Sequence, residues 1–210
     1  MNALLKKSLA EFVGVTGFLT AITAANADFK TFSLALTLGV MIILTGPISG
    51  GHLNPVVSLY FYIKREITLG NLLAFVGAQL AGGIAGANLG ALISGKTLVG
   101  FKGIADNLPF GYLAGEVVAT AGLVWLIATL VNNKQGNVIP FAVAAWVFAA
   151  ANFTPTGAQA NPAVTFGLMV QGLASNQGVS LMVAEVFGLL LAIILLIVLA
   201  PKAKKVARKK

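Results

Sequence analysis

Long runs of apolar residues, separated by short polar stretches, dominate the chain. Six of them have about the length of a membrane-spanning helix, since some 20 residues cross the ~30 Å hydrocarbon core of a bilayer. Each run ends at Gly, Pro, Asn or charged residues, which commonly terminate helices. The predicted spans are residues 8–25, 32–48, 69–93, 111–131, 138–153 and 179–200.

Two further apolar runs are too short to cross a membrane. Residues 54–63 and 161–171 each begin with the dipeptide Asn-Pro. Asn caps the free N–H groups of a first helical turn, and Pro fits the first helical position because its missing N–H needs no partner there. About nine residues at ~1.5 Å per residue reach about 14 Å. Each run therefore predicts a half-helix that begins near the middle of the membrane.

An internal repeat relates the two halves of the chain. Glu11 in the first span matches Glu116 in the fourth, 105 residues later, and the two Asn-Pro pairs are 107 residues apart. Each half holds three spans, an odd number, so the halves must be inserted in opposite directions. We therefore expect the two half-helices to enter from opposite faces and to meet, with Asn54 and Asn161 close together.

These elements predict an all-α membrane protein with six transmembrane helices and two re-entrant half-helices in an inverted repeat of three spans plus three. A glycine-rich run within the third span predicts close packing against another helix. We expect four segments along the chain. They are the first repeat (1–94), an extracellular connecting loop (95–110), the second repeat (111–200) and a basic cytoplasmic tail (201–210).

Composition supports a membrane protein and narrows the chemistry. The chain is 58% hydrophobic and 10% charged, whereas soluble domains are about 25% charged. The net charge of +8 does not indicate nucleic-acid binding, because six of the fourteen basic residues lie in the C-terminal tail. Without cysteine there are no disulfides, thiol catalysis or zinc–thiolate sites. No nucleophile–base pair is evident, so we expect no enzyme activity, cofactor, metal or nucleic-acid partner.

The distribution of Lys and Arg predicts the orientation. Of the two sides defined by six spans, one collects eleven basic residues and the other three, Lys30, Lys96 and Lys102. Basic residues favour the cytoplasmic side. We therefore expect a multi-pass protein of the cell membrane with both termini in the cytoplasm.

The two half-helix starts carry the candidate chemistry. A helix start concentrates unpaired N–H groups and the positive end of the helix dipole, so two facing starts oppose cations and protons. We expect the amide NH2 groups of Asn54 and Asn161 to donate to the oxygen of a passing neutral molecule. Irregular backbone at this depth survives only inside protein or along a water-filled cavity. The expected lining residues before the half-helices are Gly50, Gly51, His52, Leu53, Gly157, Gln159 and Ala160.

These motifs resemble the aquaporin, or major intrinsic protein, family. The resemblance rests on the paired motifs Asn-Pro-Val, with Pro55 and Val56, and Asn-Pro-Ala, with Pro162 and Ala163, and on the preceding SGGH sequence. It covers nearly the whole chain. It implies a homotetramer with one pore per subunit.

The resemblance also assigns roles to single residues. It places His52 on the cytoplasmic approach to the pore and implies that Glu11 and Glu116 brace the re-entrant loops. We interpret these glutamates, together with Glu185, as structural acceptors for loop N–H groups rather than a proton relay, because they occupy symmetry-related places.

The chain departs from the family at the outer constriction. Family members usually carry Arg directly after the second motif, where this chain has Val164. The other matched constriction positions are Leu34, Ala149 or Ala150, and Ala158. This selectivity filter lacks charge, ring and strong donor, so we expect it to be wider than a filter for water alone. Side chains that could refill the gap are those of Phe29, Phe153 and Gln159.

The predicted function is a passive channel for water and small uncharged solutes of the glycerol, urea and ammonia class, without strict water selectivity. Its partners would be the solute, membrane lipid and other copies of the chain. One alternative is an ion-coupled secondary transporter, which would need an ionisable pair or an oxygen cage at mid-membrane. The other is a structural membrane protein with a closed pore.

Overall fold

The computed structural model describes residues 1–200; the predicted basic tail lies outside the described residues. The described part folds into eight α-helices and two single 3-10 turns. The helices are α1 (Ala3–Ala24), α2 (Lys30–Ser49), α3 (Pro55–Ile63), α4 (Leu69–Ile93), α5 (Phe110–Asn132), α6 (Ile139–Phe153), α7 (Pro162–Val170) and α8 (Ser175–Val198), and the turns are η1 (Ala27–Phe29) and η2 (Gly136–Val138).

Five helical segments within residues 1–200 are long and apolar enough to cross a membrane. They comprise α2 with η1, α4, α5, α6 with η2, and α8. Helix α1 has a similar length of 22 residues. Lys6, Lys7 and Glu11 lower its mean hydropathy, so α1 is the least apolar of the six predicted spans.

The helix boundaries lie close to those predicted. The third span matches α4 at both ends. Helix α1 begins five residues before the predicted start at Ser8. Asn2 caps this earlier start, because its Oδ1 accepts a hydrogen bond from the Leu5 N–H at 2.8 Å. The last helix likewise begins earlier than predicted, at Ser175. Polar residues near the starts of α1 and α8 are typical of loops in a sequence, but in the structure they belong to the helices.

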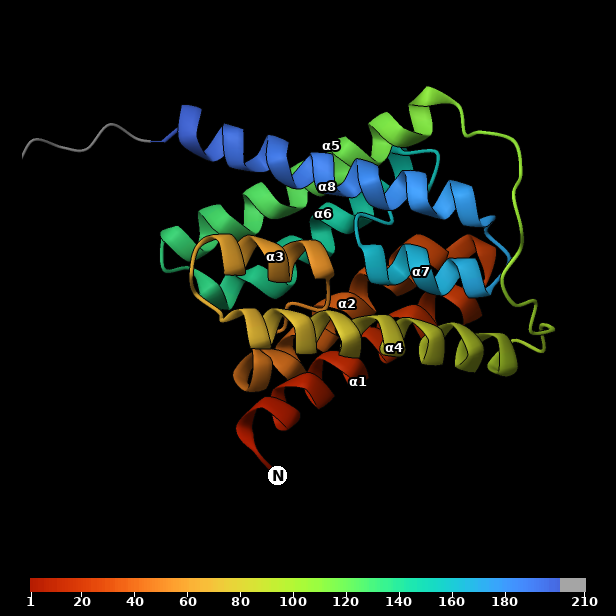
Figure 1. Cartoon of the computed structure of the whole chain (residues 1–210), viewed down its shortest axis with the longest axis horizontal. Coiled ribbons are helices and arrows are strands. Elements are labelled where there is room, and N and C mark those ends of the chain that lie inside the picture. The colour runs from red at the N-terminus through yellow and green to blue at the C-terminus, as the bar shows by residue number, and fades with distance from the viewer. Residues whose placement is uncertain (201–210) are drawn as a thin grey trace, which may run out of the picture.

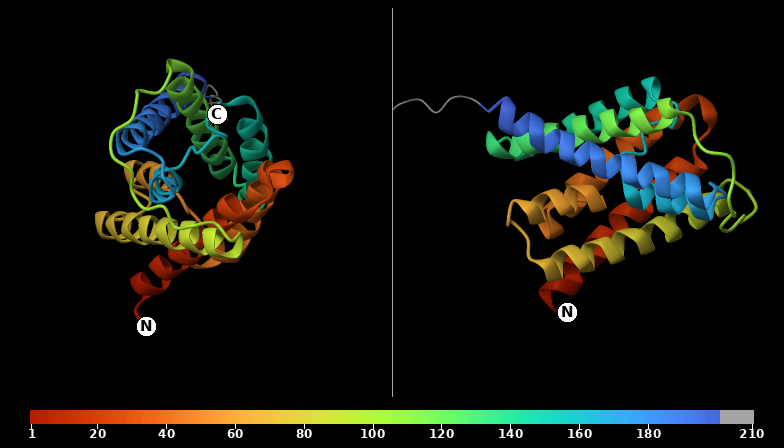
Figure 2. Two further views of the ribbon diagram at one scale, coloured as in Figure 1. Left: turned by 90° about the vertical axis from the view of Figure 1, so that its right-hand side faces the viewer. Right: turned by 45° about the horizontal axis from the view of Figure 1, so that its top comes forward.

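The two short helices lie inside the bundle and run outward from its middle. In Figure 1, α3 and α7 lie nearly end to end, and their starts face each other at the centre. Viewed along the bundle, the long helices surround them (Figure 2, left). This arrangement agrees with the predicted re-entrant half-helices entering from opposite sides.

The long helices pair in the same way in both halves. Helix α1 packs along α4, and α5 packs along α8. A Cβ added at Gly82 would lie 2.6 Å from the backbone oxygen of Phe12, and one added at Gly188 would lie 2.7 Å from that of Val117. Only glycine fits at such distances. The close packing predicted for the glycine-rich run 82–90 is therefore confirmed.

Candidate functional site

The loops that lead into the half-helices share one backbone pattern. Counting back from each asparagine, positions one, three and four have left-handed φ. These positions are Leu53, Gly51 and Gly50 in the first loop, and Ala160, Ala158 and Gly157 in the second. Left-handed φ costs L-residues about 1–2 kcal/mol each, so surrounding contacts must hold Leu53, Ala158 and Ala160 in place.

The first loop is held by Glu11 of α1. Its Oε1 accepts from the Ser49 hydroxyl at 2.5 Å and the His52 N–H at 3.0 Å, and its Oε2 accepts from the Leu53 N–H at 2.6 Å. Gln79 of α4 adds a fourth bond, from its Nε2 to Oε2 at 2.7 Å. The carboxylate, which is fully buried, thus receives donors that the irregular loop would otherwise leave unpaired.

The second loop is held by Glu116 of α5 in the same way. Its Oε1 accepts from the Thr156 hydroxyl and from the Gln159 N–H at 3.0 Å, and its Oε2 accepts from the Ala160 N–H at 2.6 Å. The symmetry differs at Glu185, which takes the place of Gln79. Its Oε1 lies 2.7 Å from the Thr165 hydroxyl. Glu185 therefore contacts a half-helix side chain, and its carboxylate also meets the backbone N–H of Asn161 at the end of the second loop.

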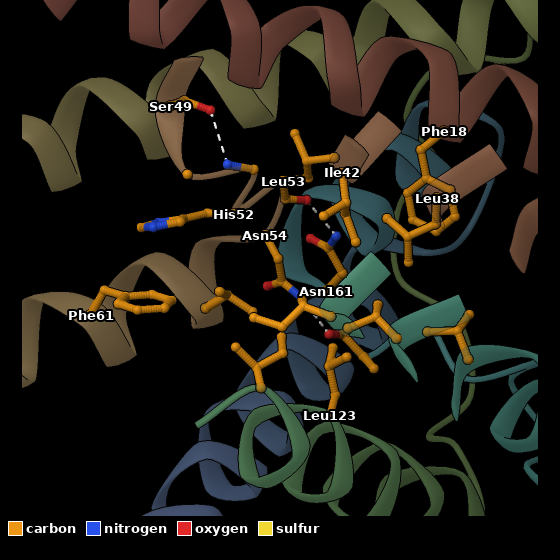
Figure 3. Close-up of a pocket in the computed structure, with 18 of the residues that line it drawn as sticks. Phe18, Leu38, Ile42, Ser49, His52, Leu53, Asn54, Phe61, Leu123 and Asn161 are labelled. Carbon is orange, nitrogen blue, oxygen red and sulfur yellow. Dashed lines mark hydrogen bonds between the residues drawn. The ribbon is translucent and has the colours of Figure 1, made fainter. Parts of the chain in front are cut away.

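The two half-helix starts are joined by reciprocal hydrogen bonds. The Asn54 Oδ1 caps α3 through the Val56 N–H at 2.9 Å, and its Nδ2 donates to the Ala160 oxygen at 2.7 Å. The Asn161 Oδ1 caps α7 through the Ala163 N–H at 3.0 Å, and its Nδ2 donates to the Leu53 oxygen at 2.8 Å. Figure 3 shows the two asparagines side by side. One of the two N–H bonds of each NH2 group is thus used inside the protein, and the other remains for the solute contact that the sequence predicts.

A cavity of about 380 Å³ reaches this contact from one end of the bundle. We call it the His52 cavity. The first loop, Asn54, Asn161, Gln159 and Ala160 contribute polar groups to the lining, and many of the other lining side chains are apolar. The apolar lining includes Leu38, Ile42, Leu123, Ile127, Val143 and Val147, of which Figure 3 labels Leu38, Ile42 and Leu123. A few polar groups among apolar side chains suit small molecules that need few hydrogen bonds.

His52 is packed at the side of this cavity. Its ring stacks on Phe61, with centroids 4.6 Å apart and planes 16° apart, and its Nδ1 lies 3.1 Å from the Ser58 hydroxyl oxygen. Figure 3 shows the His52 ring pointing toward Phe61. The side chain is thus both part of the cavity lining, as expected, and fixed by its neighbours.

A second cavity, of about 110 Å³, lies toward the other end. We call it the Val164 cavity. Three of the predicted filter residues line it, namely Leu34, Ala158 and Val164, as do Gly157 and Gln159. Three filter positions predicted from the sequence therefore lie together at this cavity, although they come from α2, the second loop and α7.

The fifth-span filter position does not line either cavity. Ala150 is 1% exposed and lies on the α6 face that carries Val143 and Val147, whereas Ala149 is exposed. Of these α6 residues, Val143 and Val147 reach the His52 cavity.

Among the three side chains considered as replacements for the missing filter Arg, only Gln159 lines the His52 or the Val164 cavity. Phe29 and Phe153 are 64% and 56% exposed, and neither lines the His52 or the Val164 cavity.

Sequence reasoning missed most of the apolar lining residues, and two of the missed residues matter for the function. Phe18 of α1 lines both, and Lys30, at the start of α2, lines the Val164 cavity. Phe18 belongs to an apolar run in which any member is a candidate for core or lipid contact, so no sequence signal distinguished it. The sequence analysis considered Lys30 only as a basic residue that indicates membrane orientation. Its position one helical turn before the filter residue Leu34 was a signal that it could line the same cavity.

No group of three or more His, Cys, Asp or Glu residues able to hold a metal ion occurs within residues 1–200. The site is built instead from backbone groups, amides and apolar side chains. Long helices around two opposed half-helices, with cavities at their meeting point, define a helical membrane channel.

Comparison with known proteins identifies the family. The Major intrinsic protein (MIP) family matches residues 2–154. An aquaglyceroporin from Toxoplasma gondii is 32% identical over 203 residues, which cover 88% of this chain and 73% of that protein. Aquaglyceroporin AqpS from Rhizobium meliloti is 31% identical over 195 residues, which cover 91% and 83%. The X-ray structure of the aquaglyceroporin from Plasmodium falciparum shares the fold, with a TM-score of 0.70 at 17% identity, covering 92% of this chain and 95% of that chain.

The chain therefore belongs to the major intrinsic protein family, the channels called aquaporins and aquaglyceroporins that pass water and small solutes. This confirms the predicted family, the all-α membrane fold and the non-enzymatic channel function. The tetramer, the host membrane, the orientation of the termini and the roles of single pore residues stay predictions.

Proposed function

We propose that the chain conducts water and small uncharged solutes such as glycerol or urea passively, past the contact between Asn54 and Asn161, and without strict water selectivity. The observation that carries this proposal is the succession of the His52 and Val164 cavities, which lie on either side of Phe18 and Gln159. A solute moving between them passes the remaining N–H bonds of the two asparagines. Glycerol and urea can accept such bonds through their oxygen atoms.

Ion exclusion in this proposal has two sources. The first is the pair of facing helix starts, whose dipoles present positive ends at the same place. The second is Lys30, which is the one charged residue among the described residues lining the Val164 cavity. Together they oppose cations although Val164 replaces the filter Arg.

The absence of that Arg supports passage of solutes larger than water. Leu34, Ala158 and Val164 offer apolar surface and no side-chain donor to the Val164 cavity. An apolar wall accommodates the carbon atoms of a polyol, which a charged and narrow filter excludes. The aquaglyceroporin names of the similar proteins agree with this substrate class.

The residues described at the two asparagines do not provide the ionisable pair that the alternative, an ion-coupled transporter, would need. The charged residues that line the His52 cavity are Lys7 and Glu66, which lie near the first and third span boundaries rather than at the asparagines. Glu11 and Glu116 direct their carboxylates to loop N–H groups. A cation moving past the asparagines would therefore meet no carboxylate among the residues described there.

The proposed assembly follows the family: a homotetramer in the cell membrane, one pore per subunit, both termini in the cytoplasm. In that orientation the His52 cavity opens to the cytoplasm and the Val164 cavity to the outside. The excess of Lys and Arg on the side of both termini supports it.

The test is a flux panel on purified protein in proteoliposomes. Stopped-flow light scattering would follow water, glycerol and urea, and a pH-sensitive dye would follow protons. The proposal expects solute flux with a low activation energy, no dependence on proton or sodium gradients and little proton leak. Flux that requires an ion gradient would support the transporter instead, and no flux of any solute would support a closed structural protein.

A further inference from the structure

The His52 and Val164 cavities share two lining residues, Phe18 and Gln159. Each of the other lining residues of the two cavities belongs to one cavity alone. In Figure 3, Phe18 lies at the opposite end of the drawn cavity from His52. The boundary between the cavities is therefore formed by Phe18 of α1 and Gln159 of the second loop.

The Phe18 ring is fixed by packing. It is 3% exposed and belongs to the same buried cluster as Leu34 and Leu38 of α2. Leu34 lines only the Val164 cavity and Leu38 only the His52 cavity. The ring thus packs in one cluster with two leucines that line different cavities.

The Gln159 side chain is fixed by hydrogen bonds. Its Oε1 lies 2.6 Å from the Thr165 hydroxyl, which also lies 2.7 Å from the Oε1 of Glu185. Thr165 and Glu185 are fully buried, and the Gln159 backbone N–H is held by Glu116. No acceptor within residues 1–200 binds the Gln159 Nε2, so its NH2 group remains to serve a solute at the cavity boundary.

We propose that Phe18 and Gln159 form the selectivity constriction of this channel, deeper in the protein than the filter positions Leu34, Ala158 and Val164. The inference rests on the proposed channel function. It assigns to this pair the two elements that those positions lack, a ring and a hydrogen-bond donor. The ring offers a flat apolar surface to carbon atoms, and the amide donates to an oxygen. The bulk of the two side chains narrows the path, so the pair passes water and limits the rate at which larger neutral solutes, such as a short polyol, pass.

The test compares variants at the boundary with variants on either side of it. Phe18→Leu and Gln159→Ala remove bulk from the pair. Phe12→Leu, on the same helix as Phe18, and Gln171→Ala are matched controls, because they make the same changes at residues that line neither cavity. Leu34→Ala and Leu38→Ala compare one lining residue on either side of the boundary. Each protein would be purified as the full chain, checked for a monodisperse elution profile and reconstituted. The readout is the ratio of glycerol to water permeability.

We expect Phe18→Leu and Gln159→Ala each to raise the glycerol-to-water ratio several-fold. Phe12→Leu and Gln171→Ala should leave the ratio near the wild-type value, and Leu34→Ala and Leu38→Ala should raise it less than the two boundary variants. An equal rise in Leu34→Ala would overturn the inference and return the constriction to the outer filter. An unchanged ratio of glycerol to water permeability in either Phe18→Leu or Gln159→Ala would also overturn the inference. If Phe18→Leu does not fold, Gln159→Ala against Leu34→Ala decides the matter.

Thr165 tests the positioning of Gln159 separately. Thr165→Val removes the hydroxyl that holds the amide and should shift the ratio in the direction of Gln159→Ala, whereas Thr165→Ser keeps the hydroxyl and should restore it. A Thr165→Ser variant that behaves like Thr165→Val would contradict this positioning. A wild-type protein that passes neither water nor glycerol would refute the proposed function itself, which is a different outcome from unchanged selectivity in active variants.

Discussion

The reciprocal bonds between the half-helices make a prediction that separates two roles of one side chain. Asn54 caps α3 and also reaches across to Ala160. Asn54→Ala removes both interactions. Asn54→Ser keeps a good capping oxygen but is too short to reach the Ala160 carbonyl, so it removes only the bond between the helices.

The structure sets the expected magnitudes. Asn54 is 4% exposed and Ala160 2%. Loss of an N-cap side chain costs about 1 kcal/mol, and a buried carbonyl left without its donor costs about 1–3 kcal/mol. We expect the free energy of unfolding to fall by about 1–3 kcal/mol in Asn54→Ser and by about 2–4 kcal/mol in Asn54→Ala.

The assay is reversible unfolding in mixed detergent micelles against the mole fraction of SDS, followed by far-UV circular dichroism. Asn2 provides the control, because it caps α1 through Leu5 but is exposed. Asn2→Ser should leave the free energy unchanged. If Asn54→Ser is as stable as the wild type, the bond to Ala160 contributes nothing and the reasoning fails. If it is as unstable as Asn54→Ala, the capping contribution is refuted.

Other consequences can be measured on the same preparation. Val164→Arg should narrow the Val164 cavity and reduce glycerol and urea flux more than water flux; equal loss of all three would place residue 164 away from the path. Lys30→Glu should raise cation and proton leak, while Lys102→Glu, at a lysine that does not line the cavity, should not; leak in both or neither would contradict the role of Lys30. Glu116→Ala leaves two buried loop N–H groups unpaired and should lower the free energy of unfolding by about 2–6 kcal/mol, measured by SDS titration; a neutral effect would disprove the bracing. Mercurials should not inhibit flux, since the chain contains no cysteine; inhibition in the light-scattering assay would require another ligand.

Much of the fold follows from local sequence signals. Apolar length places the spans, and the Asn-Pro pairs place the starts of α3 and α7 because capping chemistry is local. The spacing of Glu11 and Glu116 indicates matching halves, and the structure shows matching loop contacts for both.

What escaped prediction depends on contacts between distant segments. Leu53, Ala158 and Ala160 have left-handed φ, although nothing in their side chains favours it. The conformation comes from glutamates about 40 residues away in the chain. Phe18 is equally hidden, because an apolar residue lining a cavity has the same sequence pattern as one in the core.

The crosswise bonds between the two asparagine amides and the two carbonyls also bear on biogenesis. Leu53 leaves the ribosome long before Asn161, so its oxygen has no amide to accept from while the first half is alone in the bilayer. Neither half of the chain can form the crosswise hydrogen bonds at the meeting point of the half-helices by itself. A chain stopped before α7 would therefore leave the Leu53 oxygen without its protein donor, and the centre of the pore would be incomplete.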